Sequence, residues 1–127
     1  MVPGSENREP RTENGLLGVT MIEFVASGSP RVIAQAIEAY AAEQRTLTAL
    51  VVPWESDDAS LSMSVTAVAG DGWAIEHTNL GTIRLIDLGD ERTRVAAVAD
   101  VDQPEQKQVR LFDRFAQEVA QRFRVAP

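Results

Sequence analysis

The sequence contains no cysteine, which excludes disulfides, thiolate metal ligands and cysteine nucleophiles. It also has no apolar run near the ~18 residues that a membrane-spanning helix needs. Its N-terminus lacks a basic start followed by an apolar stretch, so no secretory signal is indicated. We therefore expect a soluble, cytoplasmic protein without a membrane span.

Positive charge is scarce: 12 basic residues stand against 19 acidic ones, and the net charge is −7. Proteins that bind nucleic acid draw much of their affinity from lysine and arginine contacts to phosphates, so a nucleic-acid partner is disfavoured. Several arginines do fall near the end of the chain. However, Arg114, Glu118 and Arg122 follow one another at four-residue spacing, which is typical of solvated ion pairs on a helix.

Signatures of common enzymes and cofactor sites are missing too. There is no glycine-rich phosphate loop, no GxSxG motif and no HExxH motif. The single histidine, His77, has no second histidine with which to bind a metal. We expect neither a cofactor nor a metal, and no residue cluster dictates a reaction.

The sequence does have a long amphipathic segment at residues 102–124. Its apolar residues recur at three- and four-residue spacing and form one stripe: Val109, Phe112, Phe115, Ala116, Val119, Ala120 and Phe123. Asp102 with Glu105 three residues later is a capping-box pattern, which predicts the start of this helix. A shorter helix is predicted over Pro30–Gln44, because serine followed by proline is a typical helix start.

Six segments have the character of strands: residues 19–26, 46–52, 60–69, 73–78, 82–88 and 93–101. In the clearest, Leu61, Met63 and Val65 alternate with serines, which gives one apolar and one polar face. Short turns between the later segments predict an antiparallel meander. Residues 1–15 are polar and are expected to form a flexible tail. The predicted fold class is α+β: residues 16–127 form one domain in which a curved antiparallel sheet of about six strands packs on the C-terminal helix.

Three short stretches resemble parts of a known family. Residues 26–30 (ASGSP) join the first strand to the first helix, residues 82–85 and 89–95 form a late hairpin, and residues 111–116 (LFDRFA) lie in the closing helix. With the order of elements, they make residues 18–124 resemble the START-like helix-grip superfamily, the group of polyketide cyclases/dehydrases and lipid-transport proteins. Gln44 runs almost directly into Thr46, so this chain would be a small variant. The resemblance implies binding or transport of a small hydrophobic or amphipathic molecule, or a lipid, between the sheet and the last helix.

The residues that we expect to line such a cavity are Tyr40, Met63, Trp73, Ile75, His77, Phe112, Phe115 and Val119. His77 and Tyr40 could fix the orientation of the ligand. A simpler interpretation of His77 is a half-exposed residue at a strand end.

Two alternatives to a carrier stay open. The first is a protein–protein interaction module or homodimer with a filled interior, which an exposed apolar patch would favour. The second is a cyclase- or dehydratase-like enzyme in which His77 and Tyr40 act as acid–base groups, and it requires both side chains to converge on one cavity.

Overall fold

A computed structural model describes residues 21–69, 75–99 and 106–124, and within these ranges it contains five strands, two α-helices and a short 3₁₀ helix. Their order along the chain is β1 (Met21–Ser27), α1 (Pro30–Gln44), β2 (Leu47–Val51), η2 (Pro53–Glu55), β3 (Ser60–Ala69), β4 (Glu76–Gly89), β5 (Arg92–Ala99) and α2 (Gln106–Phe123). The predicted tail at residues 1–15 and the predicted turn at residues 70–72 lie outside the described residues.

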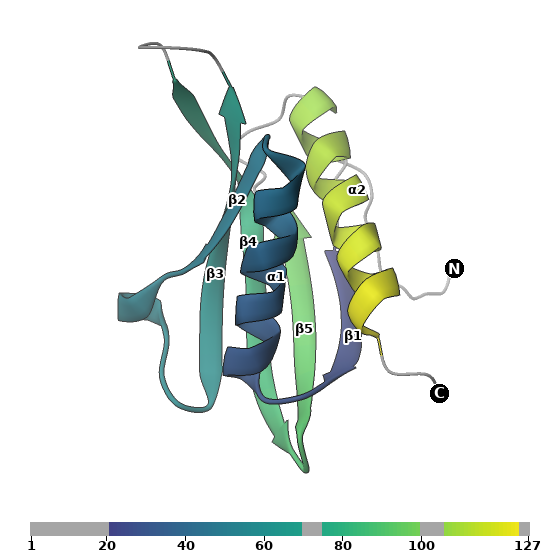
Figure 1. Cartoon of the computed structure of the whole chain (residues 1–127). Helices are drawn as coiled ribbons and strands as arrows, with labels where there is room; N and C mark the ends of the chain where they lie inside the picture. Colours follow the sequence, from purple (N-terminus) through teal and green to yellow (C-terminus); the bar gives the residue numbers. More distant parts are fainter. Residues whose placement is uncertain (1–20, 70–74, 100–105, 125–127) are drawn as a thin grey trace, which may run out of the picture.

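The strands form one antiparallel sheet in the order β1-β5-β4-β3-β2. Strands β2 to β5 form a meander, and β1 lies at the edge of the sheet, where it pairs with β5. Helix α1 therefore leads the chain from one edge of the sheet to the other. Both helices lie on the same face of the sheet (Figure 1). The predicted α+β class with an antiparallel sheet and a helix near the C-terminus is confirmed.

The number of strands differs from the prediction, because residues 73–78 and 82–88 do not form two strands separated by a turn. One strand, β4, runs through Asn79, Leu80 and Gly81 without a break. Thr66 pairs with Asn79 while Val65 pairs with Gly81, so Leu80 is an extra residue in β4. An extra residue of this kind is a β-bulge, which bends a strand without ending it. Leu80 is buried, and its neighbours Asn79 and Gly81 both pair with β3.

The two helices form where the sequence predicts them. The Oγ of Ser29 accepts a hydrogen bond from the N–H of Val32, at 3.3 Å, which caps the start of α1. The helix ends at Arg45, whose φ of 66° is left-handed and breaks the repeat. Helix α2 is described from Gln106 onward, so the predicted capping box at residues 102–105 lies outside the described residues.

The core lies between the sheet and the two helices. Alternation along the strands turns Met63, Val65 and Ile83 toward the helices, where each is fully buried. From α2, Phe112 and Phe115 are buried against them, as the apolar stripe predicts. Fully burying a side chain of this size contributes roughly 1.5–3 kcal/mol, so this layer fixes how α2 sits on the sheet.

Candidate functional site

The space between the sheet and α2 is filled by side chains. Four of the residues predicted to line a cavity there, Met63, Phe112, Phe115 and Val119, are at most 1% exposed and belong to the core. A Cβ at Gly81 of β4 would lie 2.8 Å from two atoms of the Phe112 ring and 2.5 Å from the carbonyl oxygen of Val98. The ring of Phe112 therefore sits directly on the backbone of the sheet, and glycine is what permits that approach.

Tyr40 links the two helices. Its hydroxyl donates a hydrogen bond to Glu118 Oε1 at 2.9 Å, and its ring stacks on Phe115 with centroids 5.8 Å apart. The guanidinium of Arg122 lies 4.6 Å from the centre of the same ring. Burial and then the Glu118 carboxylate raise the pKa of Tyr40 above its usual value of 10.0, although the positive charge of Arg122 works against them. With its hydroxyl engaged in this way, Tyr40 acts as an interhelical tie.

His77 lies on the opposite face of the sheet. Thr78 pairs with Ala67, and Ala67 pairs with Leu47, which is buried on the face that carries the helices. His77 is the neighbour of Thr78 in β4 and pairs with Val68. Because neighbouring residues of a strand point to opposite faces, His77 points to the face without helices, and it is exposed. The structure therefore does not bring His77 and Tyr40 together.

The other predicted site residues lie apart as well. Ile75 is 53% exposed just before β4 begins, and Trp73 lies outside the described residues. Whether any of the eight predicted residues binds a ligand stays a prediction.

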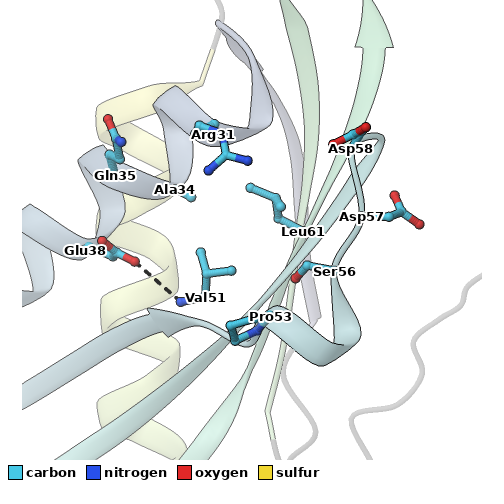
Figure 2. A pocket seen from close by; sticks show the side chains of 10 residues that line it. All are labelled: Arg31, Ala34, Gln35, Glu38, Val51, Pro53, Ser56, Asp57, Asp58 and Leu61. Carbon is cyan, nitrogen blue, oxygen red and sulfur yellow. Dashed lines mark hydrogen bonds between the residues drawn. The ribbon is translucent and has the colours of Figure 1, made fainter.

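A groove lies elsewhere, between α1 and the segment that leads from the end of β2 through η2 to the start of β3 (Figure 2). Its volume is about 430 Å³. The residues that line it are Arg31, Ala34, Gln35, Glu38, Val51, Pro53, Ser56, Asp57, Asp58 and Leu61. The groove exists because the chain leaves the sheet after Val51 and returns at Ser60, while α1 continues alongside.

The outer wall of the groove is held in place by local hydrogen bonds. The Oγ of Ser56 donates to the carbonyl of Val52 at 2.7 Å and accepts from the N–H of Ser62 at 3.0 Å. Asp57 Oδ1 accepts from the N–H groups of Ala59 and Ser60, both at 2.9 Å. This is the side-chain turn that aspartate favours, and it gives the loop a defined shape without a bound ligand.

The groove has an aliphatic floor and a charged rim. Ala34, Val51 and Leu61 provide the floor, and Leu61 projects into the middle of the space in Figure 2. The rim has Arg31 and Glu38 on the α1 side and Asp58 on the loop side. Within the described part of the chain, neither Arg31 nor Asp58 has a side-chain hydrogen bond or ion-pair partner. Glu38 has one long contact, in which its Oε2 accepts from the N–H of Val51 at 3.4 Å.

Sequence reasoning does not find this site, because residues 54–59 only separate the strands predicted at residues 46–52 and 60–69. The available signal was the combination of Pro53, which stops β2 from extending, and Asp57, a residue that favours turns. That combination predicts an ordered excursion from the sheet edge, but it does not say that α1 stands over it.

The described residues contain no group of three or more histidine, aspartate or glutamate side chains that could hold a metal ion. Neither α1 nor the described part of α2 is long and apolar enough to cross a bilayer. Comparisons with protein-family models, with curated proteins and with solved structures find no match to this chain.

Proposed function

We propose that this protein binds a small amphipathic molecule, without transforming it, in the groove between α1 and η2. The observation that carries the proposal is the contrast between two spaces. The sheet–α2 interface is filled by Phe112 on Gly81, whereas the α1–η2 groove offers about 430 Å³. Small-molecule pockets commonly measure ~300–1,000 Å³ and combine an apolar lining with a few polar groups, as this one does.

The size of the groove limits the affinity to be expected. The exposed apolar floor is small, because Ala34 and Leu61 are only 2% and 7% exposed and Val51 is half-buried. A ligand that removes on the order of 100 Å² of apolar surface from water, counting its own stem, gains about 2.5 kcal/mol at about 25 cal/mol per Å². Loss of translational freedom and of ligand flexibility reduces this gain. An aliphatic probe alone should therefore bind with a dissociation constant near or above millimolar, and a natural ligand should add polar contacts to the rim.

The proposal is tested by titrating the full chain with 1-hexanol and following backbone amide shifts by NMR. We expect shifts confined to the groove, with Leu61 and Val51 among the largest. Val51→Phe enlarges a half-buried side chain that lines the groove and should weaken binding at least fivefold, whereas Ala39→Phe, on the exposed side of α1, should not. Shifts confined to the sheet–α2 core, or equal effects of the two variants, would refute the proposal.

A second candidate function is self-association through the face of the sheet that carries no helix. The observation that favours it is the exposure of two large apolar side chains at one edge of that face. Leu50 is 57% exposed and Trp54 is 83% exposed, and both line a shallow groove of about 370 Å³. Exposed tryptophan is enriched among the residues that dominate protein interfaces.

Sedimentation velocity over a range of concentrations tests this candidate. A dimer in the unmodified protein that Trp54→Ser and Leu50→Ser both dissociate would establish it. A monomer at all concentrations would refute self-association through this face.

Membership of the START-like helix-grip superfamily is likewise a proposal. Its support is the order of elements, with β1 paired to β5 and the last helix on the same sheet face as the first. The comparisons with known proteins add no support to it.

A further inference from the structure

We propose that the α1–η2 groove selects a ligand with a cationic head, such as a primary ammonium, on an aliphatic stem. This inference rests on the proposed function and specifies the chemistry of its ligand. Two observations support it: the groove itself and the charged side chains on its rim. The ammonium would lie at Glu38, and the stem would lie on Val51 and Leu61.

The charges on the rim are unequal in number. Among the described residues that line the groove, Arg31 is cationic, whereas Glu38, Asp57 and Asp58 are acidic. Asp57 already accepts two backbone hydrogen bonds within its turn. Even without Asp57, two carboxylates stand against one guanidinium. An adjoining hollow of about 250 Å³, which shares Arg31 and Asp58 with the groove, adds a further carboxylate from Asp87.

The charges are also separated along the groove. Arg31 and Glu38 are seven residues apart on α1, so their backbone positions differ by about 10 Å along the helix axis. Figure 2 shows Asp58 across the groove at the Arg31 end, while Glu38 points toward Val51 at the other end. Arg31 therefore faces an acidic residue across the groove, whereas Glu38 is the charged lining residue at the Val51 end.

Glu38 can accept a further hydrogen bond. Glu38 is half-buried, and its carboxylate accepts one backbone hydrogen bond, which is 3.4 Å long. An ionised carboxylate can accept about four hydrogen bonds, and charge-assisted bonds to an ammonium are among the strongest. Because Glu38 adjoins aliphatic Val51, a ligand can satisfy the carboxylate and cover the apolar floor together.

The experiment compares three probes of equal chain length: hexylammonium, 1-hexanol and hexanoate. Each is titrated into the full chain at pH 7 and fixed ionic strength, with amide shifts in the groove as the readout. We expect hexylammonium to bind about tenfold more tightly than hexanoate, with 1-hexanol between them. Raising the salt concentration should narrow this preference, because screening weakens the charge contribution.

Charge-neutralising variants identify which carboxylate binds the ammonium group. Glu38→Gln should weaken hexylammonium binding about five- to tenfold and leave 1-hexanol unchanged. Asp58→Asn should have a smaller effect in the same direction, because Arg31 lies at its end of the groove. Glu43→Gln is the matched control: it removes the same charge from an exposed position of α1 outside the groove, and it should change nothing.

The outcomes separate the two proposals. If 1-hexanol or hexanoate binds in the groove as tightly as hexylammonium, the cationic selectivity is refuted while the groove remains a binding site. If none of the probes shifts groove residues, both proposals fail. If Glu43→Gln weakens hexylammonium binding as much as Glu38→Gln does, the preference reflects the net charge of −7 and the assignment to Glu38 is overturned.

The same cationic chemistry can come from a free amine or from a lysine side chain in a polypeptide. Nα-acetyl-lysine methylamide presents the second form with the backbone charges removed. Tighter binding of this compound than of hexylammonium would support the proposal with a polypeptide as the source. The reverse order would support it with a free aliphatic amine as the source.

Discussion

Substituting Gly81 by alanine should destabilise this protein, although glycine to alanine in a strand is ordinarily favourable. In an unobstructed strand the change gains roughly 0.5–1 kcal/mol, because glycine loses more chain entropy on folding. At Gly81 the added Cβ would lie 2.5 Å from the carbonyl oxygen of Val98 and 2.8 Å from the ring of Phe112. The first of these atoms belongs to the backbone of the neighbouring strand, so a side-chain rotation cannot remove the clash.

Overpacking of a well-packed core typically costs ~1–3 kcal/mol. Because both a backbone atom and a fully buried ring must move, we expect the upper part of that range and a net loss of about 2 kcal/mol. For a domain of this size, such a loss lowers the melting temperature by about 7 °C. Urea unfolding followed by circular dichroism, with melting curves in parallel, measures both quantities.

A double-mutant cycle with Phe112→Leu identifies the cause. The smaller side chain relieves the ring clash but not the clash with Val98, so the two changes together should cost less than the sum of the single changes. Gly89→Ala is the control, because Gly89 has a φ of +85° and no atom within 4 Å of an added Cβ. Its cost comes from backbone strain, so it should add to Phe112→Leu without coupling. A stable Gly81→Ala protein would mean that there is free space between the sheet and α2, which would restore the sheet–helix cavity as a candidate site.

Three further outcomes are expected. Absorbance at 295 nm, which reports on Tyr40 as the sole tyrosine, should show a midpoint above pH 10 that falls in Glu118→Gln. Because this pKa is higher in the folded protein than in the unfolded chain, the stability it contributes is fully present below about pH 10 and is lost as the pH rises through the folded-state pKa. Thr93→Val should lower the free energy of unfolding in urea by about 1–2 kcal/mol, since buried Thr93 donates a 2.7 Å hydrogen bond to the carbonyl of Gly28. A loss below about 0.5 kcal/mol, the lower limit for such a bond, would mean that water replaces the lost donor. Ser29→Ala should cost about 1 kcal/mol by removing the cap of α1, and an unchanged unfolding midpoint would show that the 3.3 Å contact contributes nothing.

The parts of the fold that depend on local chemistry could be predicted from the sequence. Ser29 and Pro30 mark the start of α1, and the apolar stripe on α2 identifies the residues that pack on the sheet. The same stripe does not reveal whether the packed layer is solid or hollow. That depends on Gly81, which lets the Phe112 ring approach the backbone, and a glycine far along the chain carries no mark of its partner.

The groove was unpredictable for a related reason. Arg31, Gln35 and Glu38 recur at helical spacing and are typical of a solvated helix face, which most of α1's polar residues indeed form. They become the rim of a site because β2 ends at Val51 and the following loop folds back opposite them. The local part, a turn around Asp57, could have been inferred, but the placement of α1 over that turn is a tertiary outcome.

The position of His77 shows how one residue can decide a functional interpretation. Counting back by twos from buried Ile83 through Gly81 along an unbroken strand places His77 on the face that carries the helices. The extra residue at Leu80 reverses that alternation for every position before it, so His77 pairs with Val68 on the opposite face. An acid–base pair of His77 and Tyr40 would require both side chains on one side of the sheet. The bulge separates them, so the structure does not provide the acid–base pair that this reaction would need.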